Sequence, residues 1–215
     1  MYQAVIFDLD GTLLYTLEDL KDGVNHVMRN WNYPERTLDE VRRFVGNGIH
    51  KLIERAVPEG LEDEKVEQVF EEFKTYYTAH CEIKTRPYDG IMELLAQLKE
   101  KGIKLAIVSN KNDAAVKELA RDYFADYIEK KVAIGEREGI RKKPAPDSVF
   151  EAMRILGVDK KDTVYVGDSD VDRATAKNAG LDCISVTWGF RDEALLKSLE
   201  PEYLIAEPEE ILDIV

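Results

Sequence analysis

An apolar run that ends in two acidic residues lies within the first thirteen residues, and it limits the fold more than any other stretch. Val5-Ile6-Phe7 is rich in β-branched and aromatic side chains, which predicts a buried strand. Asp8-Leu9-Asp10-Gly11-Thr12 follows directly. Burying a carboxylate is costly unless a cation or hydrogen-bond donors compensate it. Because open α/β sheets bind ligands outside the carboxyl ends of their strands, Asp8 and Asp10 are predicted to lie at a binding site.

The spacing of these two carboxylates indicates a hard divalent cation, and Mg²⁺ prefers such oxygen ligands. Gly11 would let the chain turn sharply and expose backbone N–H groups. The alternative is an ordinary turn after a strand, in which an aspartate only caps the local backbone. Other stretches of the chain are needed to decide between the two interpretations.

Strand and helix signals alternate from Pro87 onward, which predicts a parallel sheet with right-handed crossovers. Gly or Pro marks several helix boundaries, as at Gly102, Pro146 and Gly180. The strands are predicted at residues 104–108, 132–134, 163–167, 183–186 and 203–205, and the main helices at 92–102, 113–123, 146–156 and 172–179. We therefore expect a doubly wound, Rossmann-like α/β core.

Residues 16 to about 83 carry only helix signals. Thr16–Asp19 and Thr37–Glu40 resemble capping boxes, Gly46-Asn47-Gly48 marks a turn, and a long helix is predicted over 62–79. We therefore expect a small helical cap at 16–83, inserted into a catalytic core formed by 1–15 and 84–215.

Composition excludes several classes of function. The formal net charge of the 215-residue chain is −13, which disfavours nonspecific nucleic-acid binding and anionic membrane surfaces. No apolar segment approaches the length of a membrane span, and Asp8 and Asp10 interrupt the only early apolar run, so no signal peptide is predicted. Cys81 and Cys183 are far apart, in no metal or redox spacing, and are predicted to be idle or buried thiols. We expect a cytoplasmic enzyme, either a monomer or a homodimer.

Four segments bring polar residues to the predicted carboxyl edge of the sheet. They are Asp8 with Asp10, Ser109 with Asn110, Lys143 before Pro144, and Gly167-Asp168-Ser169-Asp170-Val171-Asp172. Carboxylates, a hydroxyl and an ammonium are the groups that phosphoryl transfer needs, since the protein mostly positions groups and neutralises charge in that reaction.

In this order and on these elements, the four segments resemble the four motifs of haloacid dehalogenase superfamily phosphatases. Within that superfamily the chain is similar to the phosphoglycolate phosphatase-like branch, which carries a helical cap between its first and second motifs. The stretches that carry this closer resemblance are Gly46-Asn47-Gly48, Val108-Ser109-Asn110-Lys111, Lys143-Pro144-Ala145-Pro146 and Thr187-Trp188-Gly189-Phe190.

The resemblance implies a role for each motif. Asp8 would be the nucleophile that forms an aspartyl-phosphate, and Asp10 the general acid and base. Ser109 would hydrogen-bond the phosphoryl group, and Lys143 would balance the charge of the carboxylates and of that group. Substrate contacts are expected from the remaining motif residues Gly11, Thr12 and Asn110.

In the cap, the glycines of the Gly46-Asn47-Gly48 turn allow close backbone approach, and Asn47 offers a donor and an acceptor, so Asn47 is the candidate substrate contact. The alternative is a turn that only joins two helices.

The resemblance also implies a Mg²⁺ site, formed by the Asp8 side chain, the Asp10 backbone carbonyl and Asp168. Asp172 is expected to orient waters or Lys143 without binding the metal itself. Asp170 is expected to be only a helix cap.

Arg141 and Lys142 adjoin Lys143, and only the following Pro144 selects Lys143 as the motif lysine. Trp188 and Phe190 are expected to be packing residues. The alternative is that they border the site, because they follow a strand end.

The predicted activity is Mg²⁺-dependent hydrolysis of small phosphomonoesters, with 2-phosphoglycolate as the leading substrate. Pyrophosphatase, nucleotidase and sugar-phosphate phosphatase or mutase activities remain open alternatives. Dehalogenation is disfavoured because that branch lacks the second aspartate, which is present here as Asp10. The alternative from another class is a receiver-like, phosphorylation-controlled binding module, which would need neither a leaving-group acid nor a cap.

Overall fold

The computed structural model describes residues 1–215, which divide into two compact units. Met1–Leu14 and Pro87–Val215 form the core unit, and Tyr15–Arg86 forms the helical unit. The two connections between them pair as short strands, β2 (Leu14–Tyr15) and β3 (Arg86–Pro87), which the sequence did not predict. None of the helices combines the length and the apolar character that crossing a membrane requires.

A six-stranded parallel sheet organises the core unit, in the order β5-β4-β1-β6-β7-β8. Its strands are β1 (Ala4–Phe7), β4 (Lys104–Asn112), β5 (Ala133–Glu136), β6 (Thr163–Gly167), β7 (Asp182–Val186) and β8 (Tyr203–Ile205). Successive strands are added outward from β1 on both sides, so the chain reverses direction across the sheet beside β1. Ligands bind at this kind of topological switch point in open α/β sheets. The predicted α/β fold class is confirmed.

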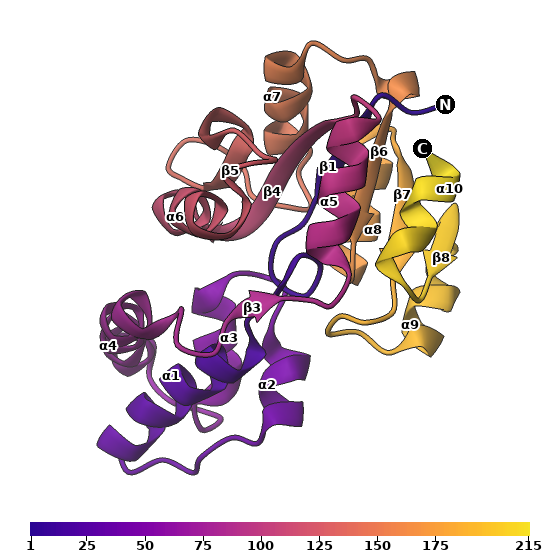
Figure 1. The fold of residues 1–215 in the computed structure, drawn as a ribbon. Coiled ribbons are helices and arrows are strands. Elements are labelled where there is room, and N and C mark those ends of the chain that lie inside the picture. The colour runs from indigo at the N-terminus through magenta and orange to yellow at the C-terminus, as the bar shows by residue number, and fades with distance from the viewer. The chain divides into compact units, whose positions relative to one another are not determined.

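Helices cover both faces of this sheet (Figure 1), with α5 and α10 on one face and α7 and α8 on the other. The core helices are α5 (Ile91–Glu100), α6 (Asp113–Phe124), α7 (Asp147–Leu156), α8 (Asp170–Ala179), α9 (Glu193–Ser198) and α10 (Ile211–Ile214). Three 3₁₀ turns complete the unit, η1 (Lys130–Val132), η2 (Lys160–Asp162) and η3 (Pro208–Glu210).

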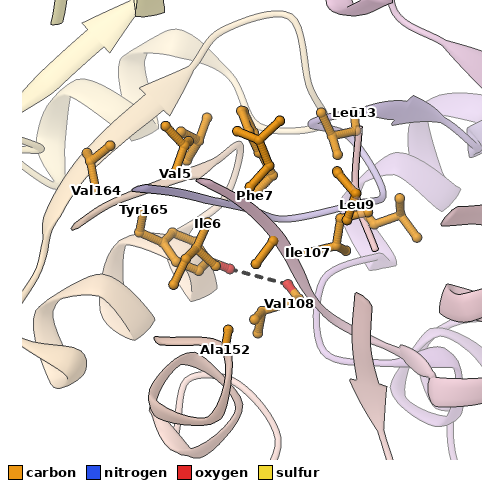
Figure 2. Close-up of a cluster of buried hydrophobic side chains, with 14 of the residues drawn as sticks. Val5, Ile6, Phe7, Leu9, Leu13, Ile107, Val108, Ala152, Val164 and Tyr165 are labelled. Carbon is orange, nitrogen blue, oxygen red and sulfur yellow. Dashed lines mark hydrogen bonds between the residues drawn. The ribbon is translucent and has the colours of Figure 1, made fainter. Parts of the chain in front are cut away.

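β1 lies at the centre of the hydrophobic core, and all four of its residues are fully buried. Figure 2 shows Ile6, Val108 and Tyr165, from three adjacent strands, on the side of the sheet that faces Ala152 of α7. A parallel strand covered on both faces needs apolar side chains in both directions, which explains the continuous apolar run in the sequence. The core therefore fixes β1 and, with it, the position of the acidic residues that follow.

The helical unit consists of α1 (Leu17–Asn30), α2 (Leu38–Phe44), α3 (Ile49–Ala56) and α4 (Asp63–His80). Its buried side chains recur at helical spacing, for example Val24, Val27 and Met28 on α1 and Val66, Val69 and Phe73 on α4. The capping box predicted at Thr37 and Glu40 is confirmed by reciprocal hydrogen bonds. Gly46 and Gly48 both have positive φ angles, as the predicted turn requires.

Two predicted helix caps are wrong. Thr16 precedes α1, but its side chain caps nothing, and its buried Oγ1 has no hydrogen-bond partner. Asp19 instead accepts hydrogen bonds from the backbone N–H groups of Lys84 and Thr85, because it is buried beside the returning chain. In the core, α8 begins at Asp170, so the cap is Ser169 and not Asp170.

Candidate active site

Asp8 directly continues β1 at the carboxyl edge of the sheet. Its backbone N–H donates to the Val166 carbonyl of β6 at 2.9 Å, which holds the residue in line with the strand. The carboxylate is buried, and its Oδ1 lies 2.8 Å from the Lys143 Nζ. The acidic residue that the sequence places first is therefore inside the protein and paired with a cation.

Lys143 is positioned by β4 through a side chain–backbone pair. The Asn110 Oδ1 accepts from the Lys143 N–H at 2.8 Å, and the Asn110 Nδ2 donates to the Lys143 carbonyl at 3.1 Å. Lys143 is buried, whereas the Arg141 and Lys142 side chains are largely exposed and pair with Asp147 and Glu136. Of the three adjacent basic residues, only Lys143 enters the site.

Asp172 lies in the first turn of α8 and is completely buried. Its Oδ1 accepts from the Lys143 Nζ at 2.8 Å and from the Tyr165 hydroxyl at 3.0 Å. Its Oδ2 accepts from the Ser169 N–H and hydroxyl within the capping box. Both oxygens of Asp172 are therefore engaged by donors of the protein.

Asp168 follows β6 and is held by the loop after β7. Its Oδ2 accepts from the Phe190 N–H at 2.6 Å, and its Oδ1 lies 3.4 Å from the Thr12 hydroxyl. Gly189 and Gly11 leave the space that this carboxylate occupies. A Cβ atom added at Gly189 would lie 2.2 Å from the Asp168 Cβ, and one added at Gly11 would lie 2.5 Å from its Oδ2. Trp188 closes the same turn by donating its Nε1–H to the Thr12 carbonyl at 3.0 Å.

Burial and mutual repulsion raise the pKa values of the carboxyl groups in this cluster. Burial and the Asp172 carboxylate raise the pKa of Asp168 to about 7. The same two causes raise the pKa of Asp8 well above its ordinary value, despite the neighbouring Lys143. Burial alone would lower the pKa of Lys143, but Asp172 and Asp8 hold it above its usual range. One ammonium does not balance three buried carboxyl groups, and this excess of negative charge favours a bound cation.

Asp10, Lys111 and Ser109 lie at the same edge of the sheet. Asp10 is partly exposed, and its Oδ1 accepts from the Lys111 Nζ at 3.0 Å. Ser109 is buried, and its Oγ accepts from the Lys111 N–H at 3.2 Å. β4 runs to Asn112, so all three polar residues of its Ser109-Asn110-Lys111 stretch belong to the strand.

Gly11 and Thr12 differ from the expectation that their turn exposes N–H groups. The Gly11 N–H donates to the Leu14 carbonyl at 2.9 Å, and the Thr12 N–H to the Leu9 carbonyl at 3.3 Å. The tight turn after β1 satisfies both donors itself. In this structure the two residues hold Asp168, through the space at Gly11 and the hydroxyl of Thr12.

Asn47 belongs to the helical unit, where its Oδ1 accepts from the Arg55 Nη2 at 2.7 Å. The hydrogen bond ties the Gly46-Asn47-Gly48 turn to α3. A contact between Asn47 and a substrate stays a prediction.

The arrangement of carboxylates suits a hard divalent cation. One carboxylate oxygen from each of Asp8, Asp168 and Asp172 lies within 4.8 Å of the others, and all three residues are buried. Oxygen donors of this kind suit Mg²⁺. Asp172 accepts four hydrogen bonds from the protein, two on each oxygen. The Asp168 Oδ1 has only the long 3.4 Å contact with Thr12, and the Asp8 contact with Lys143 is made by Oδ1, so Asp8 and Asp168 are the better side-chain ligands of the three.

Sequence reasoning missed four groups of this site. It gave no role to Lys111, Tyr165 or Gly189. For Phe190 it considered packing or a place at the border of the site, but not the backbone N–H, which donates to Asp168. Tyr165 carried a usable signal, because a hydroxyl in an otherwise aliphatic buried strand needs a partner. Lys111 adjoins the Ser109-Asn110 pair, but nothing in the sequence indicates that it reaches Asp10.

Comparison with known proteins shows the family of this chain. Residues 5–186 match the model of the haloacid dehalogenase-like hydrolase family. A phosphoglycolate phosphatase of Neisseria meningitidis is 34% identical over 219 residues, covering 98% of this chain and 92% of the relative. The pyrophosphatase PpaX of Halalkalibacterium halodurans is 30% identical over 213 residues, covering 99% of this chain and 96% of that protein.

Solved structures agree with the fold over the whole chain. The crystal structure of a protein from Lactobacillus delbrueckii subsp. bulgaricus superposes on this chain with a TM-score of 0.90 at 35% identity. The superposition covers 98% of this chain and 96% of that protein. A predicted phosphoglycolate phosphatase from Haemophilus somnus gives a TM-score of 0.88 at 26% identity, covering 99% and 97% of the two chains. The resemblance inferred from the four motifs is confirmed, and this chain belongs to the haloacid dehalogenase-like hydrolases.

Proposed function

We propose that this protein hydrolyses small phosphomonoesters with the help of Mg²⁺, and that 2-phosphoglycolate is its leading substrate. The observation that carries the proposal is the buried pair of Asp8 and Lys143 beside Asp168, with Asp10 two residues further along the chain. A nucleophile, a charge-balancing ammonium and an acid–base group are then available at one edge of the sheet.

The first step is nucleophilic attack by Asp8. Its Oδ1 is engaged by Lys143, so we assign Oδ2 as the attacking atom. Oδ2 forms a bond to phosphorus while the bond from phosphorus to the ester oxygen breaks, which yields an aspartyl-phosphate and an alcohol. Lys143 stabilises the negative charge around Asp8 throughout.

Asp10 transfers the protons. Its Oδ1 is held by Lys111, which leaves Oδ2 as the atom that protonates the departing ester oxygen. In the second step the same oxygen takes a proton from a water molecule that attacks phosphorus. Asp8 is thereby released together with inorganic phosphate, and Asp10 is protonated again for the next cycle.

Asp8, Asp168 and the Asp10 backbone carbonyl would hold Mg²⁺, which when bound supplies positive charge to the phosphoryl oxygens. The Phe190 N–H and Thr12 hydroxyl orient Asp168 for this purpose, and Asp172 orients Lys143. Ser109 and the Asn110 N–H are assigned to the phosphoryl group. We reassign Gly11 and Thr12 from substrate contact to the support of Asp168.

We keep the sequence-based proposal that residues 16–83 form a cap that selects the leaving group, with Asn47 as its substrate contact. The restriction to small esters depends on this cap. The protein would act in the cytoplasm, on a small molecule and not on nucleic acid or membrane, as a monomer or homodimer.

Pyrophosphate hydrolysis is the second candidate, because the relative from Halalkalibacterium halodurans is a pyrophosphatase. A receiver-like binding module is disfavoured by the match to a hydrolase family. The test is to compare kcat/KM across 2-phosphoglycolate, pyrophosphate, nucleotides and sugar phosphates, with Mg²⁺ and with EDTA.

The expected result is Mg²⁺-dependent turnover with the highest kcat/KM on 2-phosphoglycolate. A preference for pyrophosphate would support the second candidate. Turnover of none of these compounds, and none of p-nitrophenyl phosphate, would contradict the phosphatase assignment.

A further inference from the structure

Tyr165 is the one tyrosine among the fully buried side chains of the core, and its hydroxyl lies among the charged groups of the site. It lies in β6 between Val164 and Val166, in register with Ile6 of β1. Figure 2 shows its ring beside Ile6, with the hydroxyl directed toward β4. A phenylalanine would fill the same space, so packing does not explain the hydroxyl.

The hydroxyl contacts two charged groups and one carbonyl. It donates to the Asp172 Oδ1 at 3.0 Å and accepts from the Lys143 Nζ at 3.1 Å, while the Val108 carbonyl lies further away at 3.5 Å. A hydroxyl has a single proton, and the shorter contact assigns that proton to Asp172. Its lone pair is then free to accept from Lys143.

The Lys143 ammonium therefore has three oxygen partners. Its Nζ lies 2.8 Å from Asp8 Oδ1, 2.8 Å from Asp172 Oδ1 and 3.1 Å from the Tyr165 hydroxyl. An ammonium carries three N–H donors, so the number of acceptors equals the number of donors. Tyr165 is the only neutral partner. Burial and the Asp172 and Asp8 carboxylates raise the pKa of Tyr165, so the hydroxyl keeps its proton.

The lysine side chain is a flexible four-carbon stem that ends in three N–H donors, so each acceptor that binds Nζ restricts where the ammonium lies. Tyr165 adds a third acceptor from β6, the strand next to β1, and thereby occupies the last of the three donors. Tyr165 also binds the same Asp172 oxygen as Lys143, so it fixes the ammonium and its carboxylate partner together.

We propose that the Tyr165 hydroxyl is a positioning group that holds the Lys143 ammonium against Asp8. It does not touch the substrate. The inference rests on the proposed function in assigning a kinetic effect to this position, whereas the positioning itself concerns only the folded protein. Removing the hydroxyl should lower kcat and leave KM nearly unchanged, because Lys143 acts on charge that develops during phosphoryl transfer.

The test compares Tyr165→Phe with Tyr127→Phe, which makes the same chemical change on a half-buried tyrosine of the core unit outside the site. Kinetics are measured on the best phosphate ester with saturating Mg²⁺. Removing one hydrogen bond to a charged group should lower kcat by about tenfold in Tyr165→Phe. KM should change by less than about twofold, because substrate binding does not involve the hydroxyl. Tyr127→Phe should leave both constants unchanged.

A second measurement does not depend on activity. Nitrogen-15 NMR of lysine side chains detects ammonium groups that are protected from exchange with water. Lys111 and Lys143 are the lysines whose side chains are nearly fully buried among the ion pairs, with 5% and 4% exposed. Lys111→Met identifies the Lys111 signal, and the remaining protected signal is assigned to Lys143. That signal should shift and broaden in Tyr165→Phe and stay unchanged in Tyr127→Phe.

The outcomes separate this inference from the proposed function. An unchanged Lys143 signal in Tyr165→Phe overturns the positioning role, whatever the kinetics. An unchanged kcat, or a raised KM with kcat unaffected, overturns the kinetic part. If the wild-type protein turns over no phosphate ester, the proposed function fails, and the Lys143 signal alone then decides whether Tyr165 holds the ammonium.

Discussion

The core unit and the helical unit use charge in opposite ways. In the core, Lys143 and Asp172 have 4% and 1% of their side chains exposed. The partners of Lys143 are Asp8 directly after β1, Tyr165 of β6 and Asp172 of α8. In the helical unit, pairs such as Lys65–Glu62 and Lys74–Glu71 are more than half exposed, and their partners lie three residues apart in the sequence. Exposed pairs of this kind contribute little to stability.

Buried clusters of charge indicate function more strongly than exposed pairs do. Burying several charges together is unfavourable unless each is matched closely, so such a cluster is not kept for stability alone. The helical unit has one comparable feature, the buried Asp19, but its carboxylate is fully used by Lys84 and Thr85. The core cluster instead carries more negative charge than its own lysine balances. This excess is expected of a cation-binding site and not of a purely structural contact.

The sharpest test of this comparison is Asp8→Asn. An amide does not form the phosphoryl-enzyme, so turnover should fall by about 10⁴-fold or more. The matched control is Asp170→Asn, an exposed carboxylate in the first turn of α8 that pairs with Arg191, and it should leave kcat/KM nearly unchanged. Steady-state kinetics on purified variants decide the matter. An Asp8→Asn enzyme with near wild-type turnover would contradict the covalent mechanism.

The second test concerns stability. Lys143→Met leaves buried carboxylates without their ammonium and should lower the free energy of unfolding by about 3–5 kcal/mol at neutral pH without Mg²⁺. Lys65→Met, which removes one partner of an exposed pair in the helical unit, should change it by less than about 1 kcal/mol. Urea denaturation measures both values. Equal effects would mean that burial does not distinguish the two kinds of charge pair.

The third test uses pH and Mg²⁺ together. The folded-state pKa of Asp168 is raised to about 7 from its ordinary value of 3.8. Between these values the folded state holds a proton that the unfolded state has lost, so this group lowers stability as pH rises toward 7. Mg²⁺ should relieve the repulsion, and it competes with that proton, so its stabilising effect should grow from pH 5 to pH 8.

At a Mg²⁺ concentration 100 times its Kd, the gain at pH 8 should be about 2.7 kcal/mol. The shift in Tm with and without Mg²⁺ at each pH measures it. Asp168→Asn should lose most of the gain, whereas Asp170→Asn should keep it. A gain that is equal at pH 5 and pH 8 would contradict the raised pKa as the origin of the effect.

The core was largely predictable because local pattern and topology agree. The apolar run before Asp8 predicts a buried strand. The alternation of strand and helix signals predicts the parallel sheet that brings distant motifs to one edge. Lys143 was selected by the proline after it, and the structure places it at 2.8 Å from Asp8.

The missed features depend on contacts that sequence spacing does not contain. Thr16 and Asp19 have the spacing of a capping box. The Asp19 carboxylate instead accepts hydrogen bonds from the backbone N–H groups of Lys84 and Thr85, where the chain returns. Lys111 reaches Asp10 only because β4 lies beside β1. Gly189 has to lack a side chain only because the loop after β7 lies against Asp168, where a Cβ atom would collide with it. Such pairings follow from tertiary packing, which overrides local propensity.

Asn47 allows a test of the helical unit itself. If the Gly46-Asn47-Gly48 turn contacts the substrate, Asn47→Ala removes a hydrogen bond and should lower kcat/KM for 2-phosphoglycolate by about fivefold. The activity on p-nitrophenyl phosphate should be unaffected, because its good leaving group needs less help. Arg55→Met is the matched control, since it breaks the Asn47–Arg55 hydrogen bond from the other side and keeps the amide. If both variants reduce activity on both substrates alike, the turn only joins two helices. The helical unit would then take no part in substrate selection through Asn47.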